Sequence, residues 1–175
     1  MKIIGIHGKA RSGKDTAGEY LYSRLLSNAI LPEKTSFAAP MKQMLSVGLN
    51  IPSVWLRSAI KDQQISDYNT TPRHMMQTLG TEWGRKMIHP DVWVIALHNQ
   101  IKGSSKTFII TDVRFENEAD YCRKHGMLIH IVGRGGIDSD HVSEKGLDVE
   151  TGDVVIDNSG TINDLHDNLK EIELC

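Results

Sequence analysis

The sequence predicts an α/β fold in which a five-stranded, mostly parallel β-sheet carries helices on both faces. Short apolar runs typical of buried strands alternate with longer segments whose apolar residues repeat at helical spacing. Strands that are separated by helices pair in parallel through right-handed crossovers. A glycine-rich turn also joins the first strand to the first helix. The expected strands are residues 2–7, 34–38, 107–111, 127–132 and 153–156.

Helical spacing of apolar residues predicts the outer layers. Ala17, Leu21 and Leu25 form one stripe, which predicts a helix over 14–28 that packs on the sheet. A second helix is expected over 115–125, ended by Gly126 in the position that glycine prefers beyond a helix. Further helices are expected over 40–50 and 52–60, before a polar loop over 61–70, and from Thr161 onward.

The middle of the chain contains a helix with a clear start. Thr71 is the expected N-cap and Pro72 the first helical residue. The sequence Gly80-Thr81-Glu82 is expected to bend or interrupt this helix. Pro90 ends the stretch, and Asp91 is the expected cap of the next helix.

Length and composition are those of one ordinary globular domain. The 175 residues are 39% hydrophobic and 24% charged, enough for a single core. A net charge of −2 disfavours an extended nucleic-acid surface, so no stable nucleic-acid binding is expected. The apolar runs are too short for a signal peptide or a transmembrane helix, so no membrane association is expected. Cys122 and Cys175 lack metal-ligand spacing, which favours a reducing, cytoplasmic location.

The most informative stretch is residues 8–14, whose pattern G-x-x-x-x-G-K lies between a predicted strand and a predicted helix. Such a loop turns its backbone N–H groups inward to form a nest for phosphate oxygens, and the helix N-terminus adds partial positive charge. Lys14 supplies a point charge for the β- and γ-phosphates. The alternative is a glycine-rich turn without a ligand. We interpret the segment as a P-loop, which makes the fold the three-layer sandwich of P-loop NTPases.

Asp15 occupies the position at which most P-loops have a serine or threonine that coordinates Mg²⁺. Its carboxylate could bind the metal directly, receive a proton from an attacking group, or favour the positive helix terminus. A hydroxyl follows at Thr16. Lys9 and Arg11 make the loop more cationic, and each either touches a second phosphate group or is solvated.

Two charged residues follow the apolar strand that ends near residue 111. Asp112 lies where P-loop proteins keep the carboxylate that holds Mg²⁺, although a helix-capping role is the alternative. If the chain turns after Asp112, Arg114 would point into the crevice that a parallel sheet forms at the carboxyl ends of its strands. A guanidinium there suits bidentate phosphate binding. A surface arginine is the other interpretation.

A second basic group lies in an otherwise apolar segment and consists of Arg73, Arg85 and Lys86. Arg73 and Gln77 are four residues apart and would share a helix face. Trp83 is either a core residue or a surface on which a base stacks.

Residues 133–146 have the glycine-rich, charged composition of a mobile lid. The segment contains Arg134 and three potential metal ligands, Asp140, His141 and Glu144, whose spacing is not distinctive. The other histidines do not cluster in the sequence, so structural or surface roles are expected for most of them.

Several stretches resemble the phage-type deoxynucleoside monophosphate kinases. The loop Gly8-Lys9-Ala10-Arg11-Ser12-Gly13-Lys14-Asp15-Thr16 resembles that family's variant G-K-x-x-S-G-K-D, and animal phosphomevalonate kinase has a similar loop. Residues 76–85 (MQTLGTEWGR) and 110–118 (ITDVRFENE) look like the phage family, as do 141–144 (HVSE) and 157–161 (DNSGT). The two middle motifs favour the nucleotide enzyme over the phosphomevalonate enzyme.

This resemblance implies phosphoryl transfer from ATP to a deoxynucleoside 5′-monophosphate, with Mg²⁺, to give the diphosphate and ADP. Residues 8–16 would hold the ATP phosphates, with Lys14 on the transferred group and Arg134 closing over it. The implied acceptor-binding residues are Arg73, Gln77, Trp83, Arg85 and Arg114, and the candidate metal ligands are Asp15, Thr16 and Asp112. Residues 1–175 would form one P-loop kinase domain, with an acceptor-binding helical segment over about 40–102 and a lid over about 133–146.

Two other functions stay open: a P-loop kinase for another small phosphorylated acceptor such as phosphomevalonate, and a non-catalytic nucleotide-binding regulator. The sequence lacks an Asn-Lys-x-Asp guanine motif, and its basic groups outside the loop suggest a second phosphorylated ligand, which disfavours the regulator. The expected partners are ATP and a nucleoside monophosphate. A homodimer stays open, since two-fold dimers are common among soluble enzymes. If the chain is encoded by a phage, the host cytoplasm is the expected location.

Overall fold

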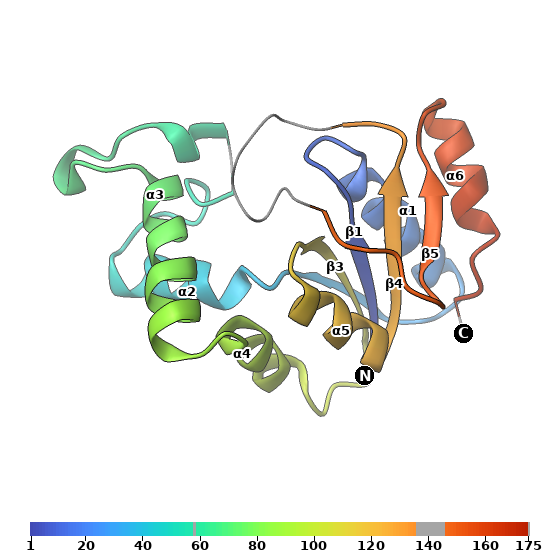
Figure 1. The fold of residues 1–175 in the computed structure, drawn as a ribbon, viewed down its shortest axis with the longest axis horizontal. Helices are drawn as coiled ribbons and strands as arrows, with labels where there is room; N and C mark the ends of the chain where they lie inside the picture. The colour runs from blue at the N-terminus through green and yellow to red at the C-terminus, as the bar shows by residue number, and fades with distance from the viewer. Residues whose placement is uncertain (58, 136–145, 175) are drawn as a thin grey trace. The chain divides into compact units, whose positions relative to one another are not determined.

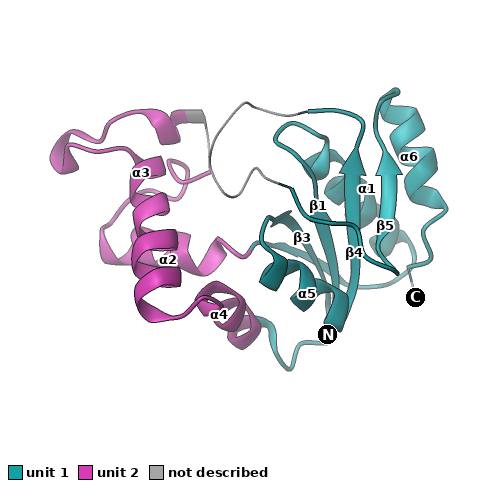
Figure 2. Cartoon of the chain, in the orientation of Figure 1, with its two compact units in different colours: residues 1–36, 101–175 teal, residues 37–100 magenta. Residues whose placement is uncertain are grey.

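The computed structural model describes residues 1–57, 59–135 and 146–174. The chain divides into two compact units (Figure 2). Residues 1–36 and 101–175 form the larger unit, and residues 37–100 form the helical unit.

Within the described residues, the larger unit contains a five-stranded sheet whose strands all pair in parallel. The strand order is β2-β3-β1-β4-β5, so β1 is central. The predicted α/β fold with a parallel sheet is confirmed. The strands are β1 (Lys2–His7), β2 (Pro32–Thr35), β3 (Thr107–Val113), β4 (Gly126–Val132) and β5 (Val154–Asp157).

Helices cover both faces of this sheet (Figure 1). On one face, α1 (Lys14–Ser27) and α6 (Ile162–Lys170) enclose a core in which Leu21 and Leu165 pack with Ile6 of β1. On the other face, α5 (Glu116–His125) approaches β1 so closely that a Cβ atom on Gly5 would lie 2.7 Å from the Cβ of Cys122. The burial of β1 on both faces explains why its sequence is almost wholly apolar.

The helical unit has its own small core. Leu45, Ile51 and Leu56 are buried there, and Met75 and Leu79 pack against them. Its elements are α2 (Ala39–Gly48), the 3₁₀ turns η1 (Ala59–Asp62) and η2 (Ser66–Tyr68), α3 (Pro72–Gln77), the wide helix η3 (Thr78–Ile88) and α4 (Val92–Ile101). None of the helices in the described part of the chain combines the length and the apolar character needed to cross a bilayer.

The predicted helix starts at Thr71 and Thr161 are confirmed. Thr71 Oγ1 accepts a hydrogen bond from the backbone N–H of His74 at 3.1 Å, as an N-cap does. Thr161 forms a capping box with Asp164, because each side chain accepts from the backbone N–H of the other residue.

Three predicted elements were wrong in their boundaries or type. Residues 53–57 form turns rather than an α-helix, and η1 follows them. The second strand is Pro32–Thr35 instead of 34–38, because β2 is an edge strand and tolerates proline at its first position. The helix that begins at Pro72 also passes through Gly80 without interruption and continues as η3.

Gly80 serves packing in the helical unit. A Cβ atom on Gly80 would lie 2.9 Å from the sulfur of Met41, and one on Gly84 would lie 2.7 Å from the Trp93 ring. The Trp93 indole N–H donates to the Gly80 carbonyl at 2.8 Å. These glycines let neighbouring side chains approach the helix backbone. From the sequence alone, a glycine with this packing role looks the same as a glycine that breaks a helix.

Gly126 ends α5 as predicted, but in an extended conformation with φ 167° rather than a left-handed one. Strand β4 begins at this residue and passes directly beside β1, where a Cβ atom would collide with the backbone of Ile3. The glycine is therefore required by the close approach of two strands.

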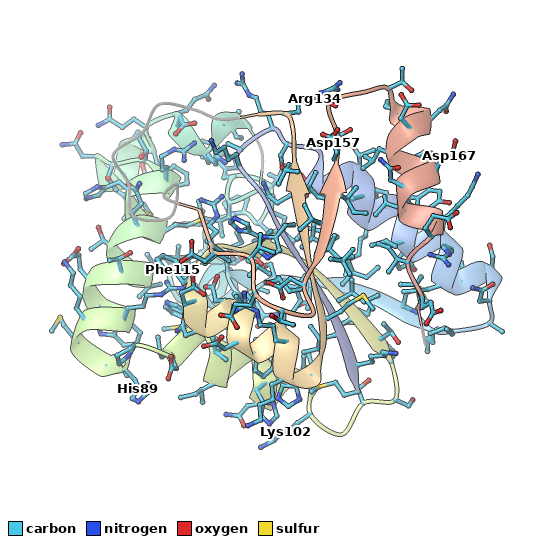
Figure 3. All side chains as sticks on the ribbon, turned by 45° about the vertical axis from the view of Figure 1, so that its right-hand side comes forward. His89, Lys102, Phe115, Arg134, Asp157 and Asp167 are labelled. Carbon is cyan, nitrogen blue, oxygen red and sulfur yellow. The ribbon has the colours of Figure 1, made fainter. Side chains whose placement is uncertain are left out.

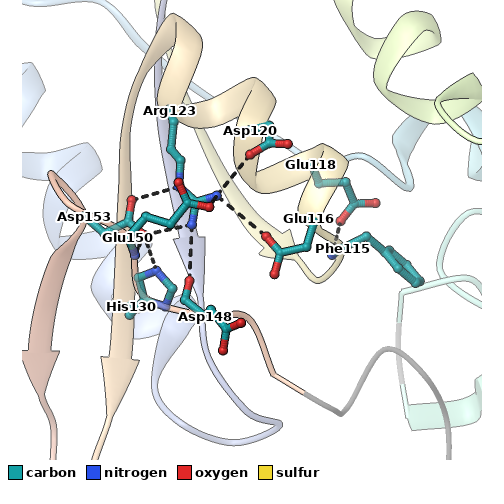
Figure 4. A network of polar contacts seen from close by, with 9 residues as sticks. All are labelled: Phe115, Glu116, Glu118, Asp120, Arg123, His130, Asp148, Glu150 and Asp153. Atoms are coloured by element: carbon teal, nitrogen blue, oxygen red, sulfur yellow. Dashed lines mark hydrogen bonds and ion pairs between the residues drawn. The ribbon is translucent and has the colours of Figure 1, made fainter.

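A network of polar contacts joins α5 to β4 and to the segment before β5 (Figure 4). Arg123 contacts both carboxylate oxygens of Asp153, at 3.1 and 2.9 Å, and His130 Nε2 lies 2.9 Å from the same carboxylate. The Asp153 side chain is 2% exposed. Burial raises the pKa of Asp153, but hydrogen bonds from Arg123, the Glu150 N–H and His130 outweigh it and hold the pKa well below its usual range.

Replacing Asp153 with Asn should destabilise the protein by about 3 kcal/mol, because the Arg123 guanidinium then loses its buried counter-charge. The native carboxyl has a lowered pKa, so its contribution is fully present above the ordinary value of 3.8 and is lost as pH falls further. Urea unfolding should therefore show a constant difference from wild type between pH 5 and 7, and a shrinking one below pH 3.8.

Asp167→Asn is the matched control. Its 2.7 Å pair with Lys170 lies on the exposed surface of α6, so the loss should stay within about 0.5 kcal/mol. Equal effects of the two substitutions would contradict a structural role of the network.

Candidate active site

The predicted P-loop follows β1 at the carboxyl end of the sheet (Figure 1). Gly13 adopts a left-handed conformation with φ 98°, and so does Arg11 with φ 61°. The Lys14 ammonium donates to the carbonyl oxygens of Gly8 at 2.7 Å and Lys9 at 2.6 Å. The lysine therefore spans the loop and holds a positive charge against its backbone.

Asn158, directly after β5, holds the P-loop through a hydrogen bond. Its side-chain amide donates to the Ser12 carbonyl at 2.8 Å, and its own N–H donates to Val132 O at 2.9 Å. A Cβ atom on Gly13 would collide with this amide, so the glycine makes room for the contact. Ser12 is fully buried, and its Oγ is the one buried side-chain nitrogen or oxygen without a hydrogen-bond partner among the described residues.

Asp15 faces the end of β3. Its Oδ1 accepts a hydrogen bond from Thr111 Oγ1 at 3.1 Å, and both Asp15 and Thr16 are exposed in the first turn of α1. Strand β3 continues past its predicted end at residue 111 and contains an irregularity there, because Gly5 pairs with Ile110 but His7 pairs with Val113. Such a bulge re-aims side chains, and here it affects Thr111 and Asp112.

Arg114 and Lys14 line one crevice of the larger unit. The crevice is formed by His7, Gly8, Lys9, Ala10, Lys14, Arg114 and Gly146. Arg114 is exposed, and its backbone N–H donates to the buried carboxylate of Glu118 at 2.8 Å. Burial and, to a smaller extent, the neighbouring His130 and Lys14 lower the pKa of His7, so this imidazole is neutral near pH 7.

Arg134 lies at the same end of the sheet as Asp157 (Figure 3). Its guanidinium donates to the carbonyl oxygens of Ser159, at 3.3 Å, and Gly160. Gly135 passes so close to the P-loop that a Cβ atom there would lie 2.7 Å from Ser12 N. Residues 136–145 of the predicted lid, with Asp140, His141 and Glu144, lie outside the described residues.

The helical unit contains the other predicted site residues. Arg73 and Gln77 are exposed on α3, and Arg73 forms a two-pronged ion pair with Asp62. Arg85 Nη1 lies 3.4 Å from the Gly80 carbonyl on η3. Trp83 is 37% exposed, so its ring is not a core residue.

Several residues near the P-loop were not singled out from the sequence. His7 and His130 are 123 positions apart in the chain, yet their rings meet edge to face with centroids 5.3 Å apart. Asn158 and Glu118 lie within motifs that carry the family resemblance, which was the one available signal for them.

The comparisons with known proteins agree with this geometry. A family model described as deoxynucleotide monophosphate kinase matches residues 56–169. The deoxynucleoside-5′-monophosphate kinase of Escherichia phage T5 is 26% identical, over 83% of this chain and 84% of its own. A protein of Acanthamoeba polyphaga mimivirus that carries such a name provisionally is 31% identical, over 95% of this chain and 93% of its own.

Among solved structures, a gluconokinase from Sinorhizobium meliloti 1021 aligns with 96% of this chain and 89% of its own, at 11% identity and a TM-score of 0.46. A likeness this low adds nothing to what the strand order shows. The family match spans more than half of the chain, includes η3, β3 and Arg114, and confirms the resemblance found in the sequence. The chain belongs to the deoxynucleotide monophosphate kinase family.

Proposed function

We propose that the protein transfers the γ-phosphoryl group of ATP to a deoxynucleoside 5′-monophosphate, giving ADP and the diphosphate. Membership of the family makes the chain an ATP-dependent phosphotransferase that acts on nucleotides. The observation that carries the proposal is that Lys14 and Arg114 line the same crevice beside the P-loop. Lys14 would bind the phosphates of the donor ATP, and Arg114 would bind the phosphate group of the acceptor.

The larger unit supplies the donor half of this reaction. The P-loop backbone from Gly8 to Gly13 would bind the ATP phosphates, with Lys14 on the transferred group. Near neutral pH the attacking phosphate oxygen is already an anion, so the reaction needs little general-base assistance. Rate acceleration would come from holding the two phosphates in line and neutralising their charge.

The residues around the P-loop also fit a magnesium ion. Asp15, Thr16 and Asp112 offer only oxygen ligands, which Mg²⁺ prefers. The exposed Asp15 carboxylate has one oxygen engaged by Thr111. When bound, the ion would neutralise charge on the β- and γ-phosphates. We propose Asp15, Thr16 and Asp112 as its ligands, directly or through water.

The acceptor half would use Arg114 together with Arg85, Arg73, Gln77 and Trp83. Arg73 already pairs with Asp62, but both side chains are about half exposed and such a pair is worth less than about 1 kcal/mol. A phosphate group carrying two charges can therefore compete for this guanidinium. Arg134, now bound to two carbonyl oxygens, would leave them to reach the transferred phosphoryl.

An ADP-release assay tests this function across acceptor classes. The protein should phosphorylate one or more deoxynucleoside monophosphates and leave phosphomevalonate unreacted. Turnover of phosphomevalonate alone would replace the nucleotide assignment with the other kinase. Tight ATP binding without transfer to any acceptor would favour a regulator. Because the relatives come from phages and a virus, we further propose the host cytoplasm as the place of action.

Lys14→Ala should lower turnover by about a thousandfold or more, since it removes the charge that the loop holds against the transferred group. The circular dichroism spectrum should be unchanged. Lys170→Ala, which removes an exposed lysine of α6, is the control and should retain wild-type turnover. Near-wild-type activity of the Lys14 variant would refute the role of this lysine.

Asp15→Asn separates metal binding from helix stabilisation. If Asp15 is a metal ligand, the variant should need about tenfold or more Mg²⁺ for half-maximal activity, because an amide is a weaker ligand than a carboxylate. Thr111→Val is the control, since it removes the hydrogen bond to Asp15 and keeps the carboxylate. An unchanged Mg²⁺ titration in Asp15→Asn would leave Asp15 a structural role.

A further inference from the structure

The peptide group between Val113 and Arg114 is held from both sides by buried side chains. His7 Nδ1 lies 2.9 Å from the Val113 carbonyl oxygen, and Glu118 Oε2 accepts from the Arg114 N–H at 2.8 Å. The two side-chain residues are 8% and 2% exposed. Because a peptide group is planar and stiff, two hydrogen bonds at its opposite ends fix its orientation.

The contact with Val113 determines the tautomer of His7. A carbonyl oxygen only accepts, so Nδ1 must carry the hydrogen. The neutral ring then has no hydrogen on Nε2, so the one ring N–H that this side chain can donate is the one at Nδ1. What His7 gives to the protein is therefore the Nδ1–H donor.

The His7 ring is itself packed against a second histidine. It meets the His130 ring at 69°, and His130 is bonded to Asp153 in the network around Arg123. On its other side, the next residue along the chain is Gly8 of the P-loop. The His7 ring thus lies between the network around Arg123 and the P-loop.

The bulge in β3 explains why the end of this strand depends on the contact with His7. Regular pairing after Gly5–Ile110 would bring Asp112 opposite His7, but the extra residue brings Val113 there instead. A bulge loosens the ladder, so the end of β3 needs another restraint. The imidazole supplies it, across the two strands that carry the P-loop and Arg114.

We propose that His7 is a positioning residue for the acceptor phosphate: its Nδ1–H fixes the peptide that carries Arg114 and so sets this arginine relative to the P-loop. The proposal rests on the proposed function only for the role of Arg114. An arginine displaced by about 1 Å costs up to about a hundredfold in rate, so the loss of one hydrogen bond here reaches the chemistry.

Asn and Leu at position 7 form a matched pair. Their side chains have nearly the same shape, but only Asn places an N–H where Nδ1 lies. His7→Leu should lower kcat/KM for the deoxynucleoside monophosphate about ten- to a hundredfold. His7→Asn should stay within about threefold of wild type, since it keeps the donor. The Kd of a non-hydrolysable ATP analogue, measured by calorimetry, should change less than about twofold in both.

A double variant shows whether His7 acts through Arg114. If it does, His7→Leu combined with Arg114→Gln should be no slower than Arg114→Gln alone. Multiplying losses, equal losses in the Asn and Leu variants, or weakened ATP-analogue binding would each overturn the proposal. So would an Arg114→Gln variant with wild-type kcat/KM.

Two measurements keep the test independent of folding and of the proposed function. If His7→Leu does not fold, Glu118→Gln and Glu118→Met repeat the comparison at the other end of the same peptide, with and without an acceptor oxygen. In the wild-type protein, nitrogen-15 NMR of the imidazole should show the proton of His7 on Nδ1. A proton on Nε2 alone would overturn the proposal whatever the substrate, whereas failure of the substrate panel would leave this tautomer unchanged.

Discussion

The larger unit depends on the central position of β1. This strand is paired on both edges and buried on both faces, so the loop that follows it emerges at the middle of the carboxyl edge. Groups from both neighbouring strands can therefore reach the loop: Arg114 follows β3, and Gly135 follows β4. Asn158, after β5, completes the support through Ser12 O. A sheet that placed this strand at an edge would leave one side of the loop open.

Three cations of the larger unit line the crevice, whereas several of its carboxylates stabilise the scaffold. Lys9, Lys14 and Arg114 line the crevice, while Glu118 is used within the fold to cap α5. Asp153 is saturated by Arg123 and neighbouring donors. Three carboxylates near Arg123, on Glu116, Asp120 and Glu150, gather around this arginine, which neutralises part of their charge. Their proximity to one another is thereby explained without a metal ion.

Sequence reasoning reached the parts of the structure that depend on local patterns. The P-loop and the cap at Thr71 follow from residue spacing, because each is determined within a few residues. The parallel sheet follows from the alternation of strands and helices along the chain. The contacts of Asn158, the edge contact of His7 with His130 and the bulge at Thr111–Asp112 join residues that are distant in the chain. They depend on register between strands, which a shift of one residue changes and which no periodicity encodes. The roles of Arg73, Arg85 and Arg134 depend on a bound substrate and stay predictions.

Gly80 illustrates why residues 71–88 were harder to interpret than the P-loop. A glycine in a helical pattern costs about 1 kcal/mol relative to alanine, so the pattern alone favours a break. In the helical unit that cost is offset by packing, since Trp93 and Met41 occupy the space beside Gly84 and Gly80. The resulting helix η3 is of the wide π type over 11 residues, a form that is rare and is frequently found at functional sites. It carries Trp83 and Arg85, two of the predicted acceptor residues. The two glycines therefore let Met41 and Trp93 pack closely against the helix that carries these side chains.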